Sequence, residues 1–145
     1  MREPLDFFVA GLPKGQPRIR AVNRGKFAGV YDPGTANDWK AAVRQEAQDA
    51  WDGIPFTGPI GLDLFFWFPR PKSHFNAKGI RKDTAPRWHT HRPDRDNLDK
   101  AILDTLKNLG VFIDDAQVCI GKISKQYTET NGGAGVNIEL YEAEP

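Results

Sequence analysis

Residues 60–68 read IGLDLFFWF, and this stretch decides the fold. Alternate residues along it are large and apolar, which is the pattern of a β-strand with one face buried: Ile60, Leu62, Leu64, Phe66 and Phe68. Prolines at positions 69 and 71 end the strand, because proline has no amide hydrogen to donate to a sheet. The stretch therefore predicts a core built on a sheet.

Two amphipathic helices are predicted, one on each side of this strand in the sequence. The first runs from about residue 36 to residue 52, where alanine, valine and tryptophan recur at helical spacing. Thr35 or Asn37 could cap its start. The second runs from about Asp96 to Asn108, and Gly110 occupies the position that often follows a helix.

Further strands are expected at Leu5–Leu12, Val118–Tyr127 and Val136–Tyr141, with a short one at Phe27–Tyr31. Asparagine and two glycines at 131–133 form a turn sequence, so the last two strands are expected to pair as a hairpin. The order strand, helix, strand, helix, strand, strand is typical of the α+β class. We expect a single domain, residues 1–145, with a mixed or antiparallel sheet of about four strands and two helices packed against it.

The composition limits the class of protein. Hydrophobic residues make up 39% of the 145 and charged residues 27%, which is typical of a globular chain. Cys119 is the single cysteine, so an internal disulfide is excluded and a reducing compartment is favoured. No apolar run reaches the length of a signal peptide core or a membrane span. The sequence therefore predicts a soluble, cytoplasmic protein with no membrane contact.

The net charge of +1 conceals a strong segregation of charge. Residues 14–26 and 70–95 together carry a net charge of +11, so the rest of the chain carries −10. A local positive field of this kind indicates a polyanionic partner, and nucleic acid first; two solvated basic loops without a partner are the alternative. The residues expected to contact DNA phosphates are Lys14, Arg18, Arg20, Arg24, Lys72, Arg87, Arg92 and Arg95.

Acidic residues stand beside this basic region, where an anion-binding surface should avoid them. They occur in Asp94-Arg95-Asp96-Asn97-Leu98-Asp99-Lys100 and again in Ile113-Asp114-Asp115-Ala116. Carboxylates in such a place are suited to divalent cations, which themselves contact phosphate. The second predicted helix and the segment from Gly110 to Asp115, if extended, have similar lengths of roughly 20 Å. A reversal at Gly110 could therefore return Asp115 to the helix start.

These charged residues also have purely structural interpretations, in which they bind no metal and take no part in catalysis. Asp96 could be the helix N-cap, with Asp99 favouring the helix dipole. The pair at 114–115 could be an ordinary turn. Lys100 lies four residues after Asp96 and could form a simple helix ion pair with it.

Two further alternatives involve the histidines of the long polar segment 70–93. His74, His89 and His91 with Cys119 could bind zinc, although their spacing matches no standard zinc finger. Trp88 and His89, next to Arg87, could instead stack on bases or contact phosphates.

The run RPDRDNLDKAILDTL, followed by GVFIDDAQV, resembles the signature of the RusA-type Holliday junction resolvases. These are dimeric, magnesium-dependent endonucleases found in bacteria and their prophages. The resemblance implies catalytic roles for Asp94, Asp96, Lys100 and Asp115, with the three aspartates holding Mg²⁺. It also implies a homodimer, which would supply two symmetric cuts to a four-way junction.

The expected reaction is hydrolysis of a DNA phosphodiester by a metal-activated water, with Lys100 neutralising charge on the scissile phosphate. One rival is a nuclease of the same chemistry that acts on flaps, forks or other branched DNA. The second is a non-catalytic DNA-binding module, and the third is a zinc-stabilised RNA-binding protein. The apolar face of residues 60–68, or the exposed aromatic residues, could form the dimer interface.

Overall fold

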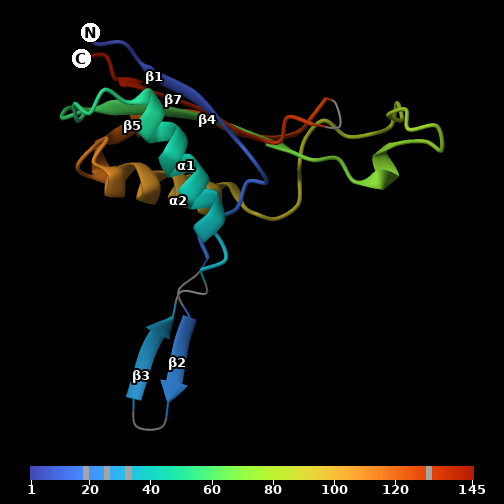
Figure 1. Ribbon diagram of the computed structural model, residues 1–145, viewed down its shortest axis with the longest axis horizontal. Coiled ribbons are helices and arrows are strands. Elements are labelled where there is room, and N and C mark those ends of the chain that lie inside the picture. Colours follow the sequence, from blue (N-terminus) through green and yellow to red (C-terminus); the bar gives the residue numbers. More distant parts are fainter. Residues whose placement is uncertain (18–19, 25–26, 32–33, 130–131) are drawn as a thin grey trace.

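The computed structural model describes residues 1–17, 20–24, 27–31, 34–129 and 132–145. Figure 1 shows a sheet with two helices on the same side of it. The helices are α1 (Asn37–Ala50) and α2 (Arg95–Leu109), and the sheet is built on β4 (Ile60–Phe68). This is the predicted α+β class, and β4 has the predicted bounds.

The main sheet has five strands, one more than expected, and it is mixed. Its order is β1 (Leu5–Ala10), β7 (Gly135–Glu142) and β4, after which β5 (Val118–Ile120) and β6 (Ile123–Tyr127) both run parallel to β4. The expected hairpin of the last two strands is therefore wrong. β7 pairs antiparallel with β1 and β4, so β4 separates it from β6. Both β4 and β7 are paired along two edges and lie inside the sheet.

The strand predicted at 118–127 is divided at Gly121. A side chain there would collide with the backbone of Leu62, and the backbone angle φ of Gly121 is +155°. Only glycine adopts such an angle readily. The break lets β5 pair with the first residues of β4, while β6 pairs with residues 64–68.

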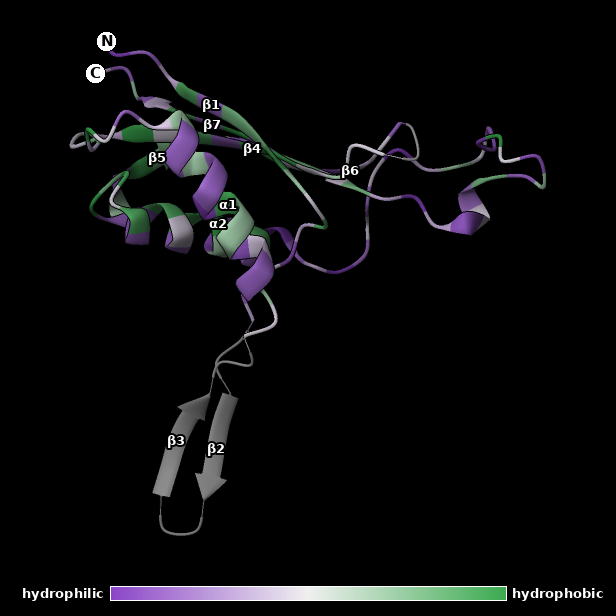
Figure 2. Cartoon of the chain, viewed as in Figure 1, coloured by the Kyte–Doolittle hydropathy of each residue, from purple (hydrophilic) through white to green (hydrophobic). Residues whose placement is uncertain are grey.

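The core lies between the sheet and the helices. The alternating apolar face of β4 is buried, and Trp39, Val43 and Ala47 of α1 are packed in the same core. Figure 2 shows hydrophobic colouring along the strands of the main sheet. This buried face of β4 cannot serve as a dimer interface, which corrects one of the two expectations. On the opposite face of the sheet, Phe8 of β1 is 38% exposed.

The N-terminal basic stretch is partly strand. β2 (Arg20–Arg24) and β3 (Phe27–Tyr31) form a separate antiparallel pair, so a strand occupies part of what was expected to be a loop. Arg20 and Arg24 lie in β2, and the prediction for Arg18 falls outside the described residues. The N-cap position of α1 is Ala36, so neither Thr35 nor Asn37 takes it.

The long polar segment has little regular structure, as expected, apart from the short 3-10 helix η1 (Lys72–His74). It is nevertheless attached to the sheet. The Arg70 guanidinium donates to the carbonyls of Thr128 and Pro86, each at 2.7 Å. Backbone hydrogen bonds also join residues 87–89 to β6. Within the described ranges, no helix is long and apolar enough to cross a membrane.

Candidate active site

The first two candidate carboxylates lie at the start of α2. Asp94 occupies the N-cap position, and its side chain makes no capping hydrogen bond. Asp96 lies in the first turn, so the alternative that Asp96 is the N-cap is wrong. Both side chains are exposed. Asp94 and Asp96 thus lie near the positive end of the helix dipole, and the Asp94 carboxylate is not taken up by a capping hydrogen bond.

The third carboxylate reaches α2 by a reversal of the chain. Gly110 ends the helix in the left-handed conformation, with φ of +96°. The chain then returns, and Asp115 Oδ2 lies 3.6 Å from Lys100 Nζ. Lys100 Nζ also contacts Asp104 Oδ1 at 3.0 Å. The chain therefore returns to α2 as expected, but Asp115 lies beside Lys100, one turn after Asp96, instead of at the helix start.

The Asp-Asp-Ala-Gln sequence at 114–117 fixes the position of Asp115. The Asp114 carboxylate accepts from the amide of Ala116 at 2.9 Å, and Gln117 Oε1 accepts from the amide of Asp114 at 3.0 Å. This is a capping box on the 3-10 helix η2 (Asp115–Gln117). Gln117 Nε2 also donates to the carbonyls of Phe56 and Gly58. Asp114 and Gln117 are thus used in the loop, which leaves Asp115 directed at α2.

A fourth carboxylate, Asp99, belongs to the same region and was not expected to be part of it. Its half-buried side chain has a pKa raised above its ordinary value, first by burial and then by the charge of Asp115. Asp115 Oδ1 is buried without a hydrogen-bond partner among the residues the structure describes. Spacing along the helix gave no signal for this pair, because Asp115 comes from a different element.

The carboxylates suit a hard divalent cation in their chemistry, and the unpartnered Asp115 Oδ1 is an oxygen that such a cation could use. They do not form a closed ligand set. In the described part of the chain, no group of three or more His, Cys, Asp or Glu side chains is arranged to hold a metal ion. Asp94 instead lies near Lys125, whose pKa is lowered by burial and raised in part by the Asp94 charge.

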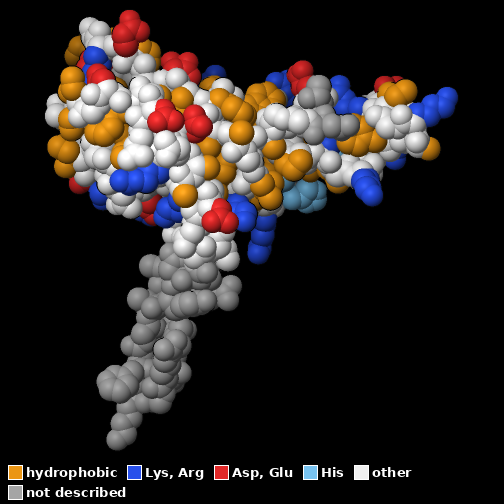
Figure 3. Space-filling model, in the orientation of Figure 1, with side chains coloured by type: hydrophobic (Ala, Val, Ile, Leu, Met, Phe, Trp, Pro, Cys, Tyr) orange, Lys and Arg blue, Asp and Glu red, His pale blue; other side chains and the backbone are white. Residues whose placement is uncertain are grey.

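Five of the predicted basic residues have side chains that the structure describes, and they lie at separate places on the loop after β1, the long segment and the start of α2: Lys14, Lys72, Arg87, Arg92 and Arg95. Arg92 and Lys14 line one cavity beside the helix start, and Arg87 stacks on Trp88 with 4.7 Å between its guanidinium carbon and the ring centroid. Lys72 lies in η1, and Arg95 is the first residue of α2. Figure 3 shows Lys and Arg side chains over the end of the molecule formed by the long segment.

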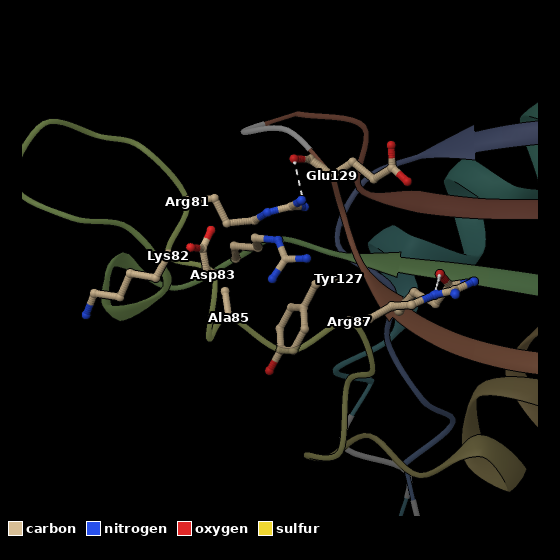
Figure 4. A pocket seen from close by; sticks show the side chains of 9 residues that line it. Arg81, Lys82, Asp83, Ala85, Arg87, Tyr127 and Glu129 are labelled. Atoms are coloured by element: carbon tan, nitrogen blue, oxygen red, sulfur yellow. Dashed lines mark hydrogen bonds between the residues drawn. The ribbon is translucent and has the colours of Figure 1, made fainter.

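A second basic cavity lies within the long segment itself. It measures about 490 Å³, and Arg81, Lys82 and Arg87 line it together with Tyr127 and Glu129. Figure 4 shows Arg81 in the middle of the lining, donating to the carbonyl of Glu129, while the Lys82 and Arg87 side chains extend outward on opposite sides. Arg81 and Lys82 were not among the predicted contacts. Their place on the same cavity as Arg87 makes them phosphate-binding candidates.

The histidines do not gather with Cys119. His89 stacks on Phe68 at the end of β4, with ring centroids 3.9 Å apart, whereas Cys119 lies in β5, which pairs with the beginning of β4. Burial and the nearby Lys125 lower the pKa of His89 to about 4. The zinc arrangement proposed from sequence would therefore need ligands from opposite ends of one strand.

Comparison with known proteins shows a match to one protein family. The family model of endodeoxyribonuclease RusA matches residues 10–140. The chain is also 34% identical over 128 residues to the uncharacterized protein YqaN of Bacillus subtilis (strain 168), with 86% of this chain and 89% of that protein covered.

Proposed function

The chain belongs to the RusA endodeoxyribonuclease family, and we propose that it is a magnesium-dependent endonuclease that resolves four-way DNA junctions by paired phosphodiester hydrolysis. The observation that carries this proposal is the return of Asp115 to α2, where its Oδ2 lies 3.6 Å from Lys100 Nζ. That return brings Asp115 beside Lys100, on the helix that also carries Asp96 and Asp99.

In this proposal Asp94, Asp96 and Asp115 would hold Mg²⁺, and Asp99 lies close enough to Asp115 for the two charges to interact. Bound Mg²⁺ would make water a better nucleophile and stabilise the leaving oxygen. The chain contributes the alignment. Lys100 meets the scissile phosphate and offsets its growing charge, while the basic residues of the long segment hold the DNA arms by their phosphates.

We also propose that the working form is a homodimer. A four-way junction needs two symmetric cuts, and a two-fold dimer supplies two sites with matching symmetry. The apolar face of β4 is committed to the core of each subunit. The aromatic residues outside the core are therefore the remaining candidates for the interface.

The test uses a labelled four-way junction and a duplex of matched sequence, each incubated with the protein with and without Mg²⁺. Cutting of the junction only with Mg²⁺ supports the proposal. Preferred cutting of flaps or forks would favour a nuclease for other branched DNA. Binding without cutting under all conditions would return the chain to a DNA-binding module.

A further inference from the structure

A cavity of about 450 Å³ opens beside the start of α2. One wall is the loop that follows β1, including Leu12 and Lys14. The other walls are Phe68, His89 and the Arg92–Pro93 pair. Pro93 directly precedes Asp94, and the amide of Gln16 donates to the carbonyl of Asn97 at 2.8 Å. The cavity thus adjoins the first candidate carboxylate and is fixed to the helix that carries it.

Two stacked rings form the inner part of this cavity. Phe68 is buried at 3% exposure, and the His89 ring lies over it with an interplanar angle of 13°. His89 Nδ1 is buried and has no partner among the described side chains and backbone groups. One face of the His89 ring is covered by Phe68, and its contacts with Tyr127 and His91 are edge-to-face, so the second face is the one that could stack on a planar ligand. Burial keeps the imidazole neutral at physiological pH by lowering its pKa, so His89 is not a phosphate-binding cation.

The rim of the cavity has a different character. Lys14 and Arg92 are both exposed there, and Leu12 is 53% exposed. An aromatic surface with cations beside it is the arrangement that binds a base together with its flanking phosphates. A cavity of this volume is of the size class that accepts small planar ligands.

We propose that this cavity takes one unpaired nucleobase from the branch point of the DNA, stacked on His89, while Lys14 and Arg92 contact the adjacent phosphates. The inference rests on the proposed function, because it assumes that branched DNA reaches this face. It adds a reason for structure selectivity. Taking a base out of its stack costs least where pairing is already weakened, so a junction would be accepted more readily than a continuous duplex.

The experiment measures affinity in Ca²⁺ for an intact four-way junction and for junctions with one abasic residue, placed in turn at each branch-point nucleotide. We expect wild-type protein to lose affinity at one position, by roughly 5- to 150-fold, the range of one base–aromatic stack. His89→Ala should bind the intact junction as weakly as wild type binds that abasic junction, with no further loss when the two changes are combined. His89→Phe keeps a ring and should behave as wild type.

His74→Ala is the matched control, because His74 is a histidine of the same segment that does not line the cavity and whose ring packs against Tyr127; it should retain the wild-type response. Equal affinity of the wild-type protein for all abasic junctions would overturn the proposal. The proposal would also be overturned if, at every branch-point position, the loss of affinity caused by His89→Ala and the loss caused by the abasic residue multiplied when the two were combined. Cleavage in Mg²⁺ is measured separately. Non-additive binding without cleavage would leave the base site standing and refute only the proposed hydrolysis.

Discussion

Replacing Asp115 with asparagine separates the proposed chemistry from the fold of the loop that carries it. The structural cost should be small. Asp115 and Lys100 have side chains 30% and 53% exposed, with 3.6 Å between Oδ2 and Nζ, and ion pairs of this exposure contribute about 0.2–1 kcal/mol. We expect the free energy of unfolding to fall by less than about 1 kcal/mol, which is a shift of Tm of roughly 4 °C or less.

The cost to cleavage should be far larger. Asparagine keeps the shape of Asp115 but removes the charge that a divalent cation requires, so we expect single-turnover cleavage in Mg²⁺ to fall by at least about 100-fold. Junction binding in Ca²⁺ should survive, because a negative charge near phosphate has been removed. The pKa of Asp99 should also fall in this variant, while remaining raised, because burial is the larger cause of its shift.

Asp104→Asn is the matched control, since Asp104 is the other carboxylate that contacts Lys100, at 3.0 Å. It removes an ion pair of similar exposure without removing a proposed metal ligand, and cleavage should fall by no more than about tenfold. Thermal melts, gel assays and an NMR titration of Asp99 complete the set. Wild-type cutting by Asp115→Asn, or equal losses in the two variants, would refute the assignment of Asp115 as a metal ligand.

Three further outcomes are expected. Junction affinity should fall steeply as salt rises, because the contacts are to phosphate, and Lys72→Glu should weaken binding at low salt; a flat salt dependence in a binding titration would contradict this. Sedimentation should give about twice the 16.3 kDa chain mass in the presence of junction DNA, and a monomer alone would remove the basis for paired cuts. The free energy of unfolding should decrease as pH falls from about 6.5 to about 4, because His89 binds its proton over this window in the unfolded state but only near pH 4 in the folded state. Urea titrations should show a weaker pH dependence for His89→Phe, and an unchanged slope would argue against a neutral, stacked His89.

The fold was predictable where one element shows its own periodicity. Alternation gave β4 its bounds, and helical spacing with Gly110 placed α2 within a residue or two. The pairing of strands was not predictable in this way. The turn sequence at 131–133 suggested a hairpin. The backbone of β7 pairs instead with β1 on one edge and with β4 on the other. Which strand lies next to which depends on how the whole sheet buries its face, and a local turn does not report it.

The part of the candidate site that lies on α2 was predictable from residue spacing. Asp96 and Lys100 share a face of α2 by spacing alone, whereas the relation of Asp115 to Asp99 and Lys100 depends on the path of the chain after Gly110. The sequence allowed that path through its length. The sequence did not show that Asp99 would be half-buried and within reach of the Asp115 charge, because burial of a side chain is set by the element that packs against it.

The two neighbouring aspartates, Asp114 and Asp115, have different roles: one forms a capping hydrogen bond and the other contacts α2. A lone aspartate after a strand-forming stretch could cap the turn or face the helix, and one carboxylate cannot do both. Here Asp114 caps the turn with Gln117, and Gln117 ties the turn to the carbonyls of Phe56 and Gly58. Asp115 is thereby left with one buried oxygen unpartnered in the described structure and the other beside Lys100. A turn that holds a carboxylate beside a lysine stabilises the fold little by that contact, and under the proposed function the same carboxylate would be one ligand of the cation while Lys100 would meet the phosphate.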